Sequence, residues 1–287
     1  MSAGRRLNLL VTGASGPSGI AAARALRGAG HTVFTVGSDW ARIEAAAAAA
    51  GDGVTPLVCD LASLAEVRAL HAGIHSRLAG TDIDGTNTAG SNTAGSNAAG
   101  TNAAASDAAG SGTPGAGGTV DGVIHLVGGW RGAKGIPDQS DEDWEFLERG
   151  AITTLRNVTR VFYDDLAASD TGRFAMVSST AVDRPTAGGA SYVAAKAAAE
   201  AWTLAVADGF HSAQSGRKQD PVEQHSAAVI FVVKALVDDG MRAKSPERRF
   251  PGFTEVEELA AAAVGLFSSP AAELNGQRRV LAPGAGN

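Results

Sequence analysis

Cysteine is nearly absent from this sequence: among 287 residues there is one, Cys59. A single cysteine excludes an intramolecular disulfide and is typical of the reducing cytosol, which predicts a cytoplasmic location. Cys59 ends an apolar stretch that starts at Pro56. In that setting we expect a buried structural thiol in preference to a reactive one. The chain is long enough to bury a full core without such a crosslink.

The sequence also lacks a basic excess and any long apolar run. Its formal net charge is −6, so neither nucleic acid nor an anionic membrane is an expected partner. No apolar stretch free of breakers approaches the roughly 18 residues of a membrane span. The apolar run after Arg6 is broken by Thr12-Gly13, which favours a strand over a signal peptide. We find no metal-ligand spacing among the six histidines and therefore predict no metal.

Tyrosine is scarce too, with two in the chain, and one of them lies four residues before a lysine. Tyr192 and Lys196 fall in an alanine-rich run that we expect to be helical, where positions i and i+4 share one face. A free tyrosine has a pKa of about 10 and is a poor acid at neutral pH. A nearby cation favours the phenolate, so this pair could form a proton donor for carbonyl reduction.

Short apolar segments alternate with helical ones along most of the chain. This pattern predicts an α/β fold with a parallel, doubly wound sheet of seven strands flanked by helices. We expect a single domain over residues 1–287, without an interdomain linker. The predicted strands are 8–12, 31–36, 55–59, 120–127, 173–178, 227–233 and 279–281. The predicted helices are 20–30, 40–50, 64–78, 141–166, 192–210 and 255–267, the last with Thr254 as its N-cap.

The alternation stops between Thr81 and Thr119, where the sequence is almost entirely Gly, Ala, Ser, Thr and Asn. Such a composition buries too little apolar surface to offset the entropy of ordering, so we interpret 81–119 as a flexible low-complexity insertion. It joins a predicted helix to the next strand, and such loops lie at the amino ends of the strands. Ligands in these sheets bind at the carboxyl ends, so the insertion is expected on the opposite edge.

A glycine-rich turn follows the first predicted strand and opens the first helix. In this context glycines let the backbone approach a pyrophosphate, and the helix N-terminus supplies N–H groups and a favourable dipole. Pro17 cannot donate from its backbone nitrogen. An ordinary strand-to-helix turn is the alternative. The candidate cofactor-binding residues in the turn are Gly13, Ser15, Gly16, Pro17, Ser18 and Gly19.

Further candidates for the cofactor follow the second and third predicted strands. Asp60, followed by Leu61, could accept a hydrogen bond from the exocyclic amine of an adenine, or could cap the next helix. After the second strand, an acidic residue binds a ribose 2′-hydroxyl and a basic residue a 2′-phosphate. The chain offers Asp39 and Arg42 there, with Ser38 before them. NAD and NADP therefore both remain open.

Ser179 ends the fifth predicted strand, thirteen residues before Tyr192. Hydroxyls at the carboxyl end of a strand fall in the ligand crevice. Ser179 could therefore hydrogen-bond a substrate carbonyl and stabilise the oxyanion that develops when hydride arrives. A purely local role in the turn after the strand is the alternative.

The glycine turn, Asp60, Ser179 and Tyr192-x3-Lys196, in this order and spacing, resemble the short-chain dehydrogenase/reductases. The resemblance covers nearly the whole chain apart from 81–119. It implies a Rossmann-type domain, an NAD(P) cofactor and interconversion of a ketone and a secondary alcohol. It makes Tyr192 the general acid, has Lys196 lower the pKa of the phenol and bind the nicotinamide ribose, and has Ser179 orient the carbonyl. Its cofactor-binding residues would include Val127, Gly128, Gly129, Tyr192 and Lys196.

The chain departs from this family at three places. His125-Leu126-Val127-Gly128-Gly129-Trp130 replaces the usual Asn-Asn-Ala-Gly, Ala151 replaces the helix asparagine of the proton relay, and Val233-Lys234 replaces Pro-Gly. These departures are similar to the dihydropteridine reductase branch, which however lacks the serine. A quinonoid pteridine or similar flat heterocycle is therefore an alternative substrate, on which Trp130 could stack. A cofactor-binding sensor or scaffold with little turnover is a further alternative.

Weaker candidates complete the sequence prediction. His125 is expected to be packed, and Asp238-Asp239 to line the cleft or form a solvated turn. Asp183 and Arg184 could meet substrate. By the same resemblance, the basic segment 241–253 corresponds to a mobile lid. Helices 141–166 and 192–210 would pair across two-fold axes in a homodimer or homotetramer, with a small-molecule carbonyl or alcohol as the other partner.

Overall fold

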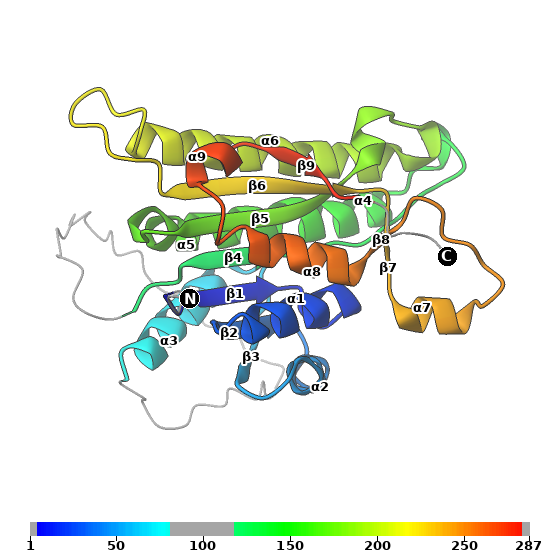
Figure 1. Ribbon diagram of the computed structural model, residues 1–287. Helices are drawn as coiled ribbons and strands as arrows, with labels where there is room; N and C mark the ends of the chain where they lie inside the picture. Colours follow the sequence, from blue (N-terminus) through cyan, green and yellow to red (C-terminus); the bar gives the residue numbers. More distant parts are fainter. Residues whose placement is uncertain (1–4, 81–117, 283–287) are drawn as a thin grey trace, which may run out of the picture.

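The computed structural model describes residues 5–80 and 118–282, and its centre is a seven-stranded parallel sheet (Figure 1). The strand order is β3-β2-β1-β4-β5-β6-β9, so the chain reverses its winding direction between β1 and β4. Parallel strands need crossover connections, and helices supply them on both faces. The strands are β1 (Asn8–Thr12), β2 (Thr32–Gly37), β3 (Val54–Val58), β4 (Gly122–His125), β5 (Gly172–Ser179), β6 (Ser226–Val233) and β9 (Arg278–Val280).

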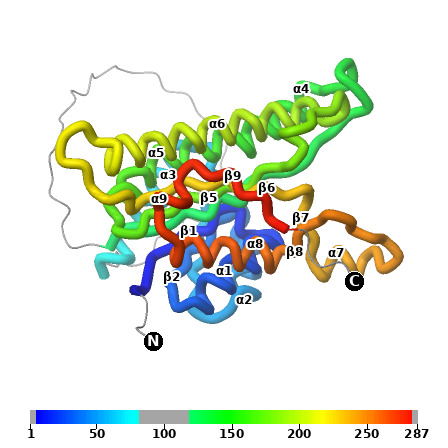
Figure 2. Tube along the Cα trace, turned by 45° about the horizontal axis from the view of Figure 1, so that its top comes forward, coloured from blue at the N-terminus to red at the C-terminus, as the bar shows by residue number. Residues whose placement is uncertain are grey.

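Helices cover both faces of the sheet and make it the middle of three layers (Figure 2). One face carries α3 (Leu64–Leu78), α5 (Thr154–Ala168) and α6 (Ala190–Ala213). The other carries α1 (Pro17–Gly28), α2 (Trp40–Ala50), α8 (Val256–Gly265) and α9 (Ala271–Leu274). Side chains alternate along each strand, so Leu10 joins the first core while Leu9 and Val11 join the second. The predicted fold class is confirmed.

Several predicted boundaries coincide with the structure, and others shift by a few residues. β1, α2 and α3 have the expected limits, whereas β4 is shorter than the predicted 120–127. The predicted insertion lies almost wholly outside the described residues. Gly80, just before it, follows the end of α3, and Gly118, near its end, precedes β4, so its attachment points are at the amino edge of the sheet.

The predicted continuous helix 141–166 is wrong in its middle. α4 (Asp141–Glu148) passes through one π-helical segment (Arg149–Thr153) before α5 begins. A π segment inserts one residue into the helical turn and frequently occurs at functional sites. Ala151, the position of the missing asparagine, is in the middle of this segment and is buried. The region has no proline, and its one glycine, Gly150, lies in the π segment but is of a kind that helices tolerate.

The prediction that Thr254 caps the last long helix is also wrong. Thr254 pairs with Leu236 in a separate two-stranded sheet of β7 (Leu236–Val237) and β8 (Thr254–Glu255), and α8 starts only at Val256. Its hydroxyl is buried without a hydrogen-bond partner. The strand pairing fixes Thr254 two residues before the helix, out of reach of the N–H groups that a cap would serve. Between β7 and β8 lies the short helix α7 (Asp239–Lys244).

Candidate active site

The glycine turn lies between β1 and α1 at the carboxyl edge of the sheet, and each glycine meets a different constraint. Gly13 has a φ of 70°, and a Cβ there would lie 2.7 Å from the backbone of Leu126. At Gly19 a Cβ would lie 2.3 Å from the Cα of Ala14. At Gly16 it would meet nothing within 4 Å. Two glycines therefore allow tight packing, while Gly16 leaves backbone open to a ligand.

Helix α1 begins with Pro17, whose missing N–H costs nothing at a first helical position. The N–H groups of Ser18 and Gly19 follow in the first turn, where a helix provides no internal acceptor. Ser15 is held by a second close approach, since a Cβ at Gly37 would lie 2.4 Å from its Oγ. The loss of one donor at Pro17 therefore leaves the anion-binding character of the turn intact.

The start of α2 contains the residues that were expected to contact the ribose. Asp39 is the N-cap and accepts a hydrogen bond from the Arg42 N–H at 2.9 Å. Ser38, Asp39 and Arg42 are all exposed at the carboxyl end of β2. A carboxylate has two oxygens, so Asp39 retains a second acceptor besides the one used for capping.

Asp60 follows β3 but does not cap the next helix, because Ser63 has that role. One oxygen of Asp60 accepts from the Ala62 N–H, and the other is 2.5 Å from the Arg149 guanidinium. Leu61 is buried, and its carbonyl accepts a hydrogen bond from Asn157 at 3.1 Å. The Arg149 pair competes for the carboxylate that would recognise an adenine, and sequence reasoning did not anticipate it.

His125 is packed, as predicted. Its ring nitrogens lie 2.8 Å from the Thr12 hydroxyl and 3.2 Å from that of Thr154. Burial, with the Lys196 charge as a second cause, lowers the pKa of His125 to about 3. The ring is thus neutral and ties β1 and β4 to α5, and it is not an acid or base for chemistry near neutral pH.

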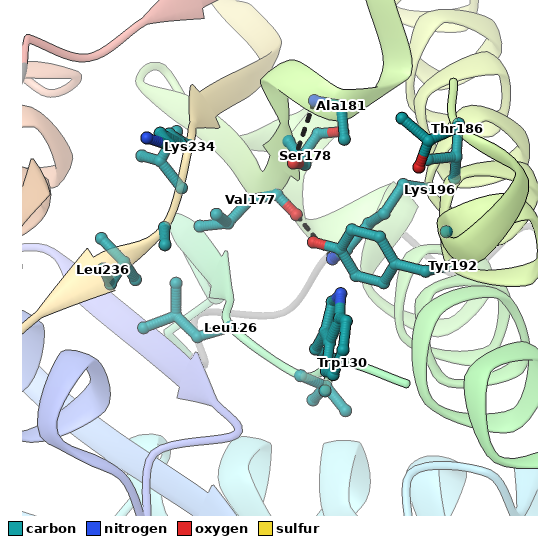
Figure 3. A pocket seen from close by; sticks show the side chains of 18 of the residues that line it. Leu126, Trp130, Val177, Ser178, Ala181, Thr186, Tyr192, Lys196, Lys234 and Leu236 are labelled. Atoms are coloured by element: carbon teal, nitrogen blue, oxygen red, sulfur yellow. Dashed lines mark hydrogen bonds between the residues drawn. The ribbon is translucent and has the colours of Figure 1, made fainter. Parts of the chain in front are cut away.

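A cavity of about 670 Å³ opens at the carboxyl ends of β4, β5 and β6 (Figure 3). Three of its walls come from the segment after β4, the end of β5 and the start of α6, and Trp130 lies beside Tyr192 (Figure 3). The sequence-predicted residues that line it are Ser18, Val127, Gly128, Gly129, Ser179, Tyr192 and Lys196. The others, Gly13, Ser15, Gly16, Pro17, Gly19, Ser38, Asp39, Asp60 and Leu61, lie outside its lining at the same sheet edge.

Ser179 and Tyr192 both line this cavity and lie within contact of each other. The Ser179 hydroxyl accepts from the Ala181 N–H at 3.1 Å, so the expected local role in the turn is real. Burial raises the pKa of Tyr192, and a hydrogen bond with Ser179 offsets part of that rise. One hydroxyl therefore both closes the turn and contacts the phenol.

Lys196 is buried beneath Tyr192, and its Nζ donates to the Val177 carbonyl at 2.9 Å. Burial lowers the pKa of Lys196 to about 8, with Glu200 acting in the opposite direction. Lys196 is not among the causes of the Tyr192 shift, whose net direction is upward. The structure therefore does not reproduce the expected lowering of the Tyr192 pKa by Lys196. The ammonium of Lys196 donates to the Val177 carbonyl instead.

A polar network behind the cavity was missed from the sequence. Ser178 donates to Glu200, and the Glu200 carboxylate is 3.0 Å from Arg278 Nε. Arg278 also pairs with Asp183 at 3.1 Å. Glu200 lies one helical turn beyond Lys196, so the series 192, 196, 200 could have indicated it. Arg278 is on the edge strand β9 and had no sequence signal.

The opposite side of Tyr192 is apolar. Ala151 packs with Leu147 and Ala195, and Tyr192 lies against this cluster. A side chain at 151 thus has the location from which a polar group could reach the phenol, but here it is a methyl group. The described surroundings of Lys196 offer the Val177 carbonyl and Glu200 instead.

The remaining candidates lie around the rim. Lys234 lines the cavity, and its Nζ donates to the Pro251 carbonyl at 2.8 Å. Asp238 caps α7, and Asp183 is held by Arg278; neither lines the cavity, and nor does Arg184. The predicted basic lid 241–253 contains the end of α7 and a cluster of Arg242 and Arg248 on Phe250. The mobility expected of this segment stays a prediction.

Comparison with known proteins agrees with this architecture. The family model described as short chain dehydrogenase matches residues 101–214, a range that contains Ser179, Tyr192 and Lys196. No curated protein sequence matches the chain. No helix within residues 5–80 and 118–282 is long and apolar enough to cross a membrane.

Solved structures of low sequence identity share the fold over its whole length. A gluconate 5-dehydrogenase from Burkholderia cenocepacia, in complex with NADP and tartrate, is 19% identical with a TM-score of 0.68, covering 97% of this chain and 94% of its own. A short chain oxidoreductase from Pseudomonas aeruginosa with an atypical catalytic centre is 16% identical with a TM-score of 0.72, covering 97% of each chain. An NAD+-bound xylitol dehydrogenase is 16% identical with a TM-score of 0.68, covering 97% and 98%.

The sheet order and the helices on both faces define a Rossmann-type, doubly wound α/β protein. The family match adds to this fold class, because it covers the segment that contains Ser179, Tyr192 and Lys196. Residues 101–214 match the short chain dehydrogenase family model, and the whole fold is similar to that of solved short-chain dehydrogenases.

Proposed function

We propose that this protein is an NAD(P)-dependent oxidoreductase that interconverts a ketone and a secondary alcohol. The observation that carries the proposal is the convergence of Ser179, Tyr192 and Lys196 on one cavity at the carboxyl edge of the sheet. Ser179 orients the carbonyl, and Tyr192 transfers the proton to or from its oxygen. Lys196 provides the buried positive charge beneath both.

A nicotinamide cofactor would supply or accept the hydride. The residues present fit such a group, because Gly16 leaves an open approach to the backbone and the first turn of α1 presents free N–H groups. Ser38, Asp39 and Arg42 would bind the ribose end, and Val127, Gly128 and Gly129 would bound the nicotinamide end. Asp39 favours a 2′-hydroxyl and Arg42 a 2′-phosphate, so both cofactors belong in the test.

The Tyr192 pKa in this structure places the phenol in its protonated form at neutral pH. That form is the one required of a general acid in the reduction direction. Oxidation of an alcohol would instead need the phenolate, which burial disfavours. We therefore propose reduction as the easier direction near neutral pH.

A second candidate reaction is reduction of a quinonoid pteridine or similar flat heterocycle. Trp130 favours it, since its ring is 67% exposed at the cavity and offers a stacking surface. A sensor or scaffold with little turnover is the third candidate, and Ala151 is the observation in its favour. The intact Ser179, Tyr192 and Lys196 count against a scaffold.

NADH and NADPH titrations, followed by turnover with ketones, aldehydes and quinonoid dihydropteridine, test these candidates together. Saturable binding of either cofactor with turnover of a ketone supports the proposal. Turnover of the pteridine alone replaces the substrate class, and cofactor binding without any turnover favours the scaffold. Absence of binding to both nucleotides contradicts all three.

We propose further that the protein assembles as a homodimer or homotetramer in the cytoplasm, with a small-molecule carbonyl or alcohol as substrate. The described apolar side chains exposed on α4 and α6, Trp144, Phe146 and Leu204, support an assembly surface. The buried Cys59, whose pKa burial raises to about 12, is an unreactive thiol suited to a reducing compartment. Light scattering of the purified chain would give the mass of the assembly, and a monomer would contradict the first part.

A further inference from the structure

Three potential metal-ligating side chains meet near the amino edge of the sheet. His71 and His75 lie one turn apart on α3, and Asp165 lies near the end of α5. Their ligand atoms all lie within 4.8 Å of one another. Within residues 5–80 and 118–282 this is the one group of three such residues so close together. The sequence prediction that no histidines have a ligand spacing is therefore wrong, because i and i+4 on a helix place two imidazoles on one face.

The geometry directs both imidazoles at the same carboxylate. His71 Nε2 is 3.2 Å from Asp165 Oδ1, and His75 Nε2 is 2.7 Å from Oδ2. The two rings are 4.2 Å apart between centroids and tilted by 38°. Three donor atoms from two helices thus point into one small volume, which is the arrangement a tetrahedral ion requires of its protein ligands.

The surroundings fix the ligands and leave one side open. The Val120 N–H donates to Asp165 Oδ2 at 3.0 Å, and Phe162 packs edge-on against His71 with centroids 5.0 Å apart. The Asp165 side chain is 9% exposed, while those of His71 and His75 are 28% and 32% exposed. Such supporting contacts orient metal ligands, and the exposed side leaves room for water as a fourth ligand.

We propose that His71, His75 and Asp165 bind a divalent transition metal of the zinc, cobalt or nickel class. Two imidazoles and one carboxylate suit these ions, whereas magnesium and calcium prefer all-oxygen sites. On binding, each imidazole offers its Nε2 lone pair, so the Nε2 proton moves to Nδ1 or leaves to solvent. The metal then takes the place of those protons between the rings and Asp165.

The position of this site indicates a structural role. It connects α3 to α5 and, through Val120, to the start of β4. These segments lie at the amino edge, away from the cavity at the carboxyl edge. The metal should stabilise the fold by binding the native state alone, without entering the chemistry.

The test uses untagged full-length protein stripped with chelator, then titrated with Zn²⁺ by calorimetry and with Co²⁺ by visible absorption. We expect about one ion per chain, and a rise in Tm of roughly 5 °C when free Zn²⁺ is 100-fold above Kd. His71→Gln and His75→Gln should each abolish both signals. His211→Gln removes an exposed imidazole elsewhere and should leave them unchanged.

Two outcomes would overturn the proposal. One is the absence of saturable binding up to about 1 mM metal, because a Kd above that concentration is too weak for a specific site. The other is an unaltered stoichiometry in His75→Gln. Far-ultraviolet circular dichroism of the metal-free variants separates a lost site from a lost fold. Because neither variant changes the cavity, cofactor binding should persist in both.

Discussion

The two sides of helix α6 at Tyr192 and Lys196 are unlike each other. Toward β5 and β9, the buried Ser178 and Glu200 form a paired polar network with the partly exposed Arg278. Toward α4 and the π segment, Tyr192 lies on the apolar side chains of Leu147, Ala151 and Ala195. The family pattern given above has a polar relay on the second side. In this chain the polar groups are concentrated on the first.

From this difference we propose that the polar network positions Lys196. Glu200 is one turn beyond Lys196 and counteracts part of the fall in its pKa. Arg278 neutralises Glu200 and also holds Asp183 in the turn after Ser179. A buried carboxylate is stable only when it is paired. Arg278 therefore stabilises the negative charge of Glu200, and that charge in turn stabilises the ammonium of Lys196. The expected effects below separate the two sides.

The largest effect is expected from Tyr192→Phe, which removes the group that both sides surround. Loss of a general acid costs about 10²- to 10⁴-fold in turnover, while cofactor affinity should remain near normal. Tyr163→Phe is the matched control, because Tyr163 is the other tyrosine, packs on Phe210 and does not line the cavity. Steady-state kinetics and fluorescence titration measure both quantities. Near-normal turnover of Tyr192→Phe would exclude the mechanism.

Arg278→Met tests the polar side and should have the next largest effect. It leaves Glu200 buried without its cation, which costs about 3 kcal/mol of unfolding free energy. Arg279→Met, at the exposed neighbouring position on β9, should cost less than about 0.5 kcal/mol. Urea denaturation measures both. Equal costs for the two variants would show that the network contributes little to stability.

The sequence predicted the parts of this site that are local in the chain. The glycine turn and the Tyr192–Lys196 pair are encoded within a few residues, and helix periodicity alone brings the pair together. Arg278 and Glu200 are 78 residues apart, and Asp60 and Arg149 are 89 apart. No spacing rule predicts such contacts, since they depend on which strand ends at which edge. His71 and His75 were visible as a spacing, but their partner Asp165 was not.

The π segment had only a weak sequence signal, for a different reason. Residues 141–166 contain one glycine, Gly150, which a helix tolerates, whereas α4 and α5 both pack on α6 in the fold. Tertiary packing therefore decides the backbone at Ala151. The missing asparagine was found from the resemblance, whereas its replacement by an apolar cluster required the structure.

Ala151→Asn tests the apolar side by restoring an amide at the missing position. The side chain enters a buried cluster, so we expect a loss of about 2 kcal/mol of unfolding free energy. Ala151→Leu adds the same number of side-chain heavy atoms, branched at the same carbon, without polarity, and is the control. If the new amide takes part in proton transfer to Lys196 and Tyr192, the pH profile of kcat changes in the asparagine variant alone. Identical profiles in both variants would indicate that protons reach Lys196 independently of this side.

The smallest effect is the pH dependence that Lys196 imparts to stability. Its pKa in the folded state is about 8, below the ordinary 10.5, so the folded chain releases this proton at lower pH than the unfolded chain does. Unfolding between pH 8 and 10.5 therefore takes up a proton, and stability rises with pH across that window.

For Lys196 alone, the rise in unfolding free energy from pH 7 to pH 9 is about 1 kcal/mol. Lys196→Met removes the titrating group. The unfolding free energy of wild type minus that of the variant, measured in urea, should therefore increase by that amount from pH 7 to pH 9. Lys218→Met, at an exposed lysine, is the control and should leave the wild-type slope intact. A slope unchanged by Lys196→Met would mean that the ammonium is better solvated than its burial implies, and that the polar side of α6 already compensates its charge.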